Sequence, residues 1–143
     1  MIVSERSTAS PEVAPHRRLG TAKHLGTVFT SLAAIFLAFD TVLKVLRLAP
    51  AVEGTAALGY PADSVQWIGA IELGCLVLYL VPRTSALGAI LLTGYLGGAI
   101  ATHVRMASPL LTHTLFPVYV AVFIWGGLYL REARLHCLLP FRR

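Results

Sequence analysis

Apolar residues fall into four blocks along the chain, each about as long as a membrane-spanning helix. The blocks cover residues 25–48, 65–81, 84–102 and 112–130. Crossing the hydrocarbon core of a bilayer takes about 20 residues of α-helix, and no block alternates polar and apolar residues with the period of a barrel strand. Because lipid offers the backbone no hydrogen-bond partner, the pattern predicts an all-α membrane protein, a four-helix transmembrane bundle over residues 25–135.

Prolines mark where the blocks end. Pro82 stops the second block beside Arg83, so the second and third helices are expected to be antiparallel neighbours joined by a tight turn. Pro109 precedes the fourth block. The longest connection, residues 49–64, has a length typical of a lid or a short interfacial helix.

Composition and charge agree with a membrane protein. Hydrophobic residues make up 56% and charged residues 13% of the chain, against roughly 45–50% and 25% in soluble domains. The net charge of +5 does not indicate a nucleic-acid partner, because lysines and arginines flank the blocks instead of lining one helix face. By the positive-inside rule, this placement predicts that both termini are cytoplasmic.

The ends of the chain differ from the blocks. Residues 1–24 lack helical periodicity and are expected to form a disordered cytoplasmic tail, and residues 136–143 a basic cytoplasmic tail. A cleavable signal peptide is not expected, because no short apolar region with a cleavage site precedes the first block.

Small residues are concentrated in the third block. Gly94 and Gly98 stand four residues apart, as do Gly97 and Ala101, a spacing that lets another helix approach closely. We expect tight packing within the bundle, against the small residues of the second and fourth helices, with a homodimer through the third helix as the alternative. The expected facing residues are Ala70, Gly74, Gly126 and Gly127.

Ionisable residues inside the blocks are the main candidates for function. Asp40 and Lys44 are spaced i, i+4 on one helix face, and Glu72 lies in the second block. A charge deep in lipid costs about 2.5–3.5 kcal/mol even on insertion scales, so these side chains should face the interior and find partners. With the predicted topology they lie in the outer half of the bundle. The predicted polar, ligand-binding pocket consists of Asp40, Lys44, Glu72, His103, Arg105 and His113.

This pattern leaves open whether Lys44 pairs with Asp40 or with Glu72, and whether the pocket binds a ligand or only fixes helix register. No catalytic residue is assigned. No metal site is predicted, because His103 and His113 have no further ligand set nearby. Tyr60 is expected at the membrane interface, and Tyr95 either there or in the core, where its hydroxyl needs a partner.

Several stretches together are characteristic: "DTVLK", "LGYP", "GAIELGCLVLYLVPRTSALGAILLTGYLGGAIATHVR" and "LFPVYVAVFIWGGLYLREARL". They resemble the DoxX-like family of small bacterial four-helix membrane proteins, over roughly residues 30–140. The resemblance implies a multi-pass protein of the bacterial cytoplasmic (inner) membrane.

The founding DoxX proteins are associated with a membrane thiosulfate:quinone oxidoreductase, and other relatives with membrane redox or oxidative-stress assemblies. The resemblance therefore implies an accessory or quinone/lipid-proximal subunit with a membrane redox partner protein. No haem, flavin or iron–sulfur motif is present, so no resident cofactor is expected apart from quinone, and catalysis by this chain alone is not expected. Two alternatives are a small proton-coupled transporter in which Glu72 cycles its proton, and a membrane enzyme using Asp40 and Glu72 as an acid/base pair on an apolar substrate.

Overall fold

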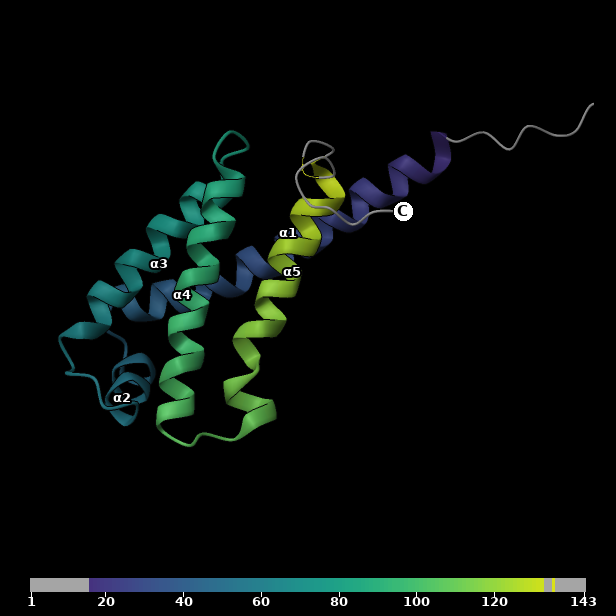
Figure 1. Ribbon diagram of the computed structural model, residues 1–143. Coiled ribbons are helices and arrows are strands. Elements are labelled where there is room, and N and C mark those ends of the chain that lie inside the picture. The colour runs from purple at the N-terminus through teal and green to yellow at the C-terminus, as the bar shows by residue number, and fades with distance from the viewer. Residues whose placement is uncertain (1–15, 133–134, 136–143) are drawn as a thin grey trace, which may run out of the picture.

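The described part of the chain is helical throughout. The computed structural model describes residues 16–132 and residue 135, and no strand occurs among them, which confirms the all-α prediction. Residues 1–15 of the predicted N-terminal tail and the predicted tail 136–143 lie outside the described residues. The elements in chain order are α1 (His16–Val45), α2 (Ala49–Ala57), α3 (Ser64–Leu80), α4 (Ser85–Arg105), the π-helix η1 (Leu110–Thr114) and α5 (Phe116–Arg131) (Figure 1).

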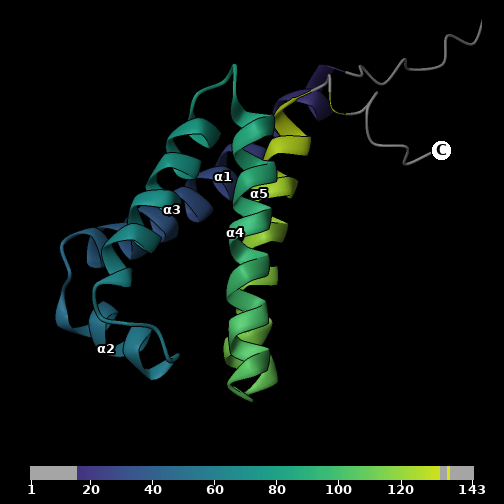
Figure 2. The ribbon, with the colours of Figure 1, turned by 60° about the vertical axis from the view of Figure 1, so that its left-hand side comes forward.

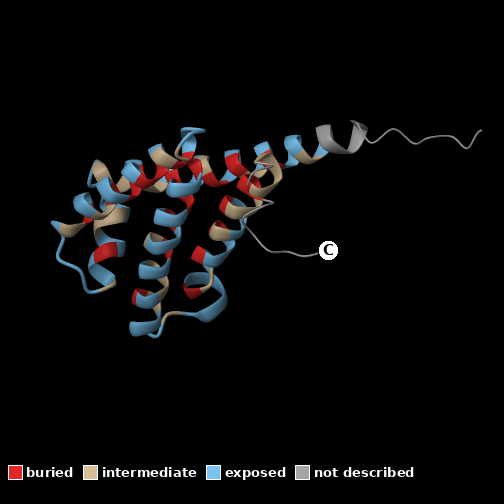
Figure 3. Ribbon diagram, turned by 45° about the horizontal axis from the view of Figure 1, so that its top comes forward, coloured by how far each residue is buried: buried red, intermediate tan, exposed pale blue. Residues whose placement is uncertain are grey.

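Three of the helical segments are long and apolar enough to cross a membrane. They are Thr21–Val45, Ser85–Arg105 and Leu110–Arg131, while Ser64–Leu80 is a shorter apolar helix. Large apolar side chains lie exposed along the outside, among them Trp67 at 74% and Ile35 at 69%. Figure 3 shows exposed residues along much of each helix. An exterior of this kind belongs in lipid.

Both ends of the first helix differ from the sequence prediction. The first helix starts at His16, so the expectation of a disordered tail was wrong for residues 16–24. No proline interrupts this segment, and extending a helix that has already nucleated costs little free energy. The same helix ends at Val45, before Arg47 takes a left-handed backbone conformation (φ 52°). The connection at residues 49–64 contains the short helix α2, which was one of the two structures expected there. Pro50 lies in the first turn of α2.

Among the four long helices, α1 packs against both α3 and α5, and α4 also packs against α3 and α5. The antiparallel pairing of α3 and α4 through the turn at residues 81–84 is confirmed (Figures 1 and 2). We call the end of the bundle that contains this turn the turn end, and the opposite end, which contains α2, the α2 end. The start of α1 and the end of α5 lie at the turn end (Figure 1).

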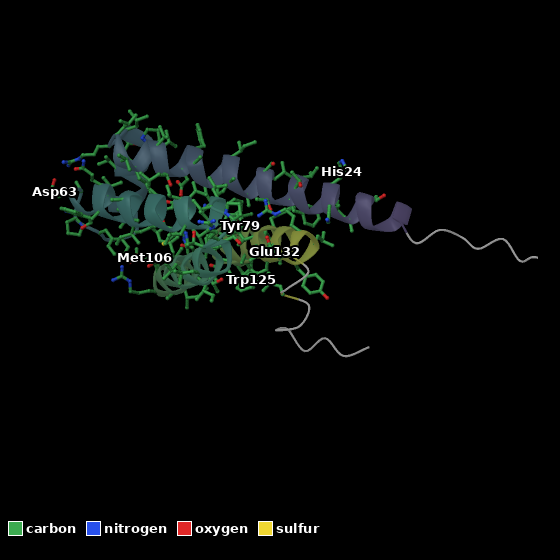
Figure 4. All side chains as sticks on the ribbon, turned by 90° about the horizontal axis from the view of Figure 1, so that it is seen from above. His24, Asp63, Tyr79, Met106, Trp125 and Glu132 are labelled. Carbon is green, nitrogen blue, oxygen red and sulfur yellow. The ribbon has the colours of Figure 1, made fainter. Side chains whose placement is uncertain are left out.

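Glycines bring the helices together at the turn end. A Cβ added to Gly88 would collide with the backbone of Tyr79, so α3 and α4 touch there without an intervening side chain. A Cβ at Gly127 would lie 2.5 Å from Thr30 Oγ1, where α5 crosses α1. The fully buried Tyr79 hydroxyl donates to Thr30 Oγ1 (3.2 Å) and to the Ile124 carbonyl (3.1 Å). Figure 4 places Tyr79 among the helices and Asp63 at the far end of α3.

The expected close approach along α4 occurs elsewhere. A Cβ added at Gly94, Gly97 or Gly98 would have no described atom of another helix within 4 Å. The prediction that the bundle packs through these glycines was therefore wrong. The reason is that α3 and α4 touch at Gly88 and diverge from the turn (Figures 1 and 2). The homodimer through α4 stays a prediction.

Candidate functional site

Lys44 joins three helices at the α2 end. Its Nζ donates to Asp40 Oδ2 on α1 (2.5 Å), to Glu72 Oε2 on α3 (2.9 Å) and to the Tyr95 hydroxyl on α4 (2.7 Å). Lys44 therefore pairs with both carboxylates, which answers the question that the sequence left open. We call Asp40, Lys44, Glu72 and Tyr95 the Lys44 cluster.

A glycine positions the two charged helices. A Cβ at Gly69 of α3 would lie 2.6 Å from Lys44 Cβ, so only a glycine allows α3 to approach α1 this closely at that level. Glu72 follows Gly69 by about one turn and therefore reaches Nζ. The helix contact and the ion pair thus depend on each other.

Glu72 is the most confined member of the cluster, because its side chain is fully buried. Oε2 accepts from Lys44 and from the Tyr95 hydroxyl (2.8 Å), whereas Oε1 has no hydrogen-bond partner among the described residues. An unsatisfied buried polar atom costs about 1–3 kcal/mol, more if charged. With two carboxylates and one ammonium, the cluster can therefore accept a further hydrogen-bond donor.

A cavity of about 520 Å³ borders the cluster, within the size range of small-molecule sites. Every long helix contributes to its wall, and most of its lining side chains are apolar. Its polar wall residues are Asp40, Lys44, Thr55, Tyr60, Glu72, Tyr95, Thr102 and His103.

The segment that follows α2, residues 58–60, lies at one end of the cavity, and we call it the cover. The Tyr60 hydroxyl shares a hydrogen bond with Thr102 Oγ1 (2.8 Å), and Arg105 Nη2 donates to the Leu58 carbonyl (2.9 Å). The guanidinium of Arg105 also lies 5.9 Å from the centre of the Tyr60 ring. These contacts connect α4 to the segment that follows α2.

The six residues predicted for the pocket do not form one set. Asp40, Lys44 and Glu72 contact one another, and His103 lines the cavity. Arg105 instead binds the cover, and the His113 ring lies 5.9 Å from that of His103, outside the cavity lining. Arg105 and His113 thus lie past the level at which α4 meets the Lys44 cluster, and their part in a ligand-binding pocket stays a prediction.

Tyr95 and Tyr60 are the site residues that sequence reasoning missed. The signal for Tyr95 was a hydroxyl near the middle of an apolar span, which needs a partner when buried. Its alignment with Glu72 depends on how α3 and α4 cross, which the sequence pattern does not specify. Within the described residues, no group of three His, Cys, Asp or Glu side chains is placed to hold a metal ion.

The DoxX-like family model matches residues 28–127, which include the Lys44 cluster and the whole cavity wall. The chain belongs to the DoxX-like family. This confirms the resemblance seen in the sequence, and with the apolar helices it identifies a DoxX-like multi-pass membrane protein. No curated protein and no solved structure matches the chain.

Proposed function

We propose that this DoxX-like protein is a ligand-binding membrane subunit without catalytic activity of its own, and that its cavity holds the polar head group of a quinone or lipid. The observation that supports this is Glu72 Oε1, a buried carboxylate oxygen beside a cavity and without a partner among the described residues. If the Glu72 carboxylate turns toward the cavity that it lines, the hydroxyl or N–H group of a lipid or of a reduced quinone would supply the missing donor. The mostly apolar wall suits the rest of such a molecule.

The proposed setting is the bacterial inner membrane, with four spans and both termini cytoplasmic. Arg83 in the turn and Arg131 at the end of α5 belong to the turn end, and a bias of basic residues toward the cytoplasm would place that end inside. At 17 residues, α3 covers about 25 Å, so it spans with little tilt. The Lys44 cluster would then lie in the outer half.

Reporter fusions test this topology. A green fluorescent protein fused after Arg143 should fluoresce, and alkaline phosphatase inserted at Ala107 should be active, because that enzyme folds only outside the cytoplasm. The reverse pattern would contradict the orientation.

The proposed role is an accessory subunit of a membrane redox or stress-response assembly, with a separate redox partner protein. Family membership supports it. The enzyme alternative has less support, because Lys44 bonds both Asp40 and Glu72 and so holds the two carboxylates on one cation.

The ligand test compares Glu72→Gln with Glu53→Gln, the same change on an exposed residue of α2. The full-length protein is purified with mild detergent, and co-purified lipids and quinones are quantified per mole by mass spectrometry. Because the buried acceptor would lose its charge, we expect occupancy of one lipid or quinone species to fall about tenfold in Glu72→Gln alone. Asp40→Asn should give a smaller decrease. Unchanged occupancy in Glu72→Gln would refute the proposed function.

A further inference from the structure

The cavity has an uncovered edge between α3 and α4. Six lining residues of the cavity are also exposed on the outside of the bundle, namely Phe36, Tyr60, Ile71, Gly94, Gly98 and Phe116. Three of them lie on the two diverging helices, Ile71 on α3 and Gly94 and Gly98 on α4. Ile71 is 60% exposed, and a Cβ at either glycine would have no described neighbour within 4 Å outside its own helix surroundings. We call these three residues the α3–α4 mouth.

The course of the two helices explains this mouth. Their backbones touch at Gly88 and Tyr79, close to the turn, and both views show them diverging toward the α2 end (Figures 1 and 2). Glycines at the two α4 positions leave open space beside the outer edge of this widened interval.

Between α3 and α4, the Tyr95 hydroxyl donates to Glu72 Oε2 (2.8 Å), and the Glu72 side chain is fully buried. The other edges also have side chains that bridge the helices. The Phe36 and Phe116 rings meet edge to face at 5.0 Å between α1 and α5. The Trp125 indole donates to Thr93 Oγ1 (2.9 Å) between α5 and α4. At the α2 end, the Tyr60–Thr102 hydrogen bond connects the cover to α4. The α3–α4 edge differs from the others in having two glycines, Gly94 and Gly98, with open space beside them, so access is least obstructed through the α3–α4 mouth.

The surroundings of the mouth restrict what can enter. Neighbouring outward residues on both helices are large and apolar, including Trp67, one turn before Ile71, at 74% and Ile90, one turn before Gly94, at 57% exposure, so the mouth faces the acyl chains of the bilayer. A molecule that enters must dissolve in lipid. Inside, two carboxylates face one ammonium, so an anionic head group would be repelled, whereas a hydroxyl or N–H donor would satisfy Glu72 Oε1.

From these observations we infer that the ligand is a neutral or cationic amphiphile with a hydrogen-bond donor in its head group, and that it enters sideways from the bilayer through the α3–α4 mouth. This inference rests on the proposed ligand-binding function and adds the chemical class of the ligand and its route.

The test uses two probes that differ in one donor, 4-nonylphenol and its methyl ether 4-nonylanisole. The full-length protein is placed in lipid nanodiscs, and binding is read from the rise of the unfolding midpoint Tm as the probe concentration increases. The variants are Gly94→Leu and Gly98→Leu at the mouth. Gly97→Leu is the matched control, because Gly97 is equally open on the same helix but does not line the cavity.

We expect wild type and Gly97→Leu to share one half-saturating phenol concentration, and each mouth variant to require at least about ten times more. The anisole should bind at least about ten times more weakly than the phenol, because it cannot donate to Glu72. The Tm of each variant without probe establishes that it is folded.

Each contrary result has a distinct meaning. If the mouth variants bind the phenol like wild type while Glu72→Gln does not, the lateral route is overturned and the proposed binding site stands. If phenol and anisole bind equally well, the donor requirement is overturned. If wild type binds neither probe and Glu72→Gln retains its co-purified lipid, the proposed function fails together with this inference.

Discussion

The two ends of the bundle are built in different ways. At the turn end, α3 and α4 meet backbone to backbone at Gly88, and the Tyr79 hydroxyl is bonded on both sides. At the α2 end, the helices diverge around a cavity, charged groups connect them, and a buried carboxylate oxygen lacks a partner among the residues described. A tightly packed end can hold the helices in register while the other end leaves room for a guest molecule.

The largest effect should come from closing the space at the turn end. In Gly88→Ala, the new methyl group would meet the Tyr79 backbone, which no rotamer change can relieve. We expect a loss of more than about 3 kcal/mol in the free energy of unfolding, measured by denaturant titration in mixed micelles. Gly97→Ala, with open space around it, should change stability by less than about 0.5 kcal/mol. Equal effects at the two positions would contradict the close contact.

The next largest effect should come from removing the charge at the α2 end. Lys44→Met leaves Asp40 and Glu72 without their shared cation, and breaking a buried pair in this way costs about 3 kcal/mol. Arg47→Met is the control, since its pair with Asp63 is exposed and worth about 1 kcal/mol or less. The same titration compares them, and a small effect of Lys44→Met would mean that the cluster does not hold the three helices together.

The same substitution at two tyrosines should separate stability from binding. Tyr79→Phe deletes a hydroxyl bonded to Thr30 and Ile124, and we expect about 1–2 kcal/mol lower stability with unchanged 4-nonylphenol binding. Tyr95→Phe deletes the donor to Glu72 beside the cavity, so its main effect should be a several-fold change in the half-saturating phenol concentration. If both variants affect binding alike, the two ends do not differ in function.

The smallest effect should come from loosening the cover. Tyr60→Phe removes the hydrogen bond to Thr102 and should cost about 0.5–1 kcal/mol. Hydrogen–deuterium exchange should then rise in α2 and stay unchanged around Tyr79. Faster exchange throughout the bundle would show that the cover is part of the stable core.

Much of the fold could be predicted from the sequence, because lipid forces apolar blocks into helices and proline marks their ends. Three apolar blocks match long helices and one a shorter helix, and the α3–α4 hairpin follows from Pro82 and Arg83. The start of α1 could not be predicted, since residues 16–24 show no apolar face and continue a helix that is nucleated further along the chain.

The site was only partly predictable, because helix periodicity is visible in the sequence and the crossing of the helices is not. The contact of Asp40 with Lys44 follows from helix periodicity alone, and the cost of burying Glu72 required a partner. Which glycines form helix contacts depends on the crossing geometry, so Gly69 and Gly88 could not be distinguished from Gly94 and Gly98 by spacing. The same geometry brings Tyr95 into the cluster and keeps His113 out of it.

The contact at Gly88 also sets the mechanics of the hairpin. Because the two backbones touch there, we expect α4 to move relative to α3 mainly by rotation about this contact. Gly98 lies about 15 Å along the helix from Gly88, so a swing of about 11° would displace it by about 3 Å. Distances between spin labels at Gly74 on α3 and Gly97 on α4, two open positions outside the cavity lining, measured with and without 4-nonylphenol, would report that swing.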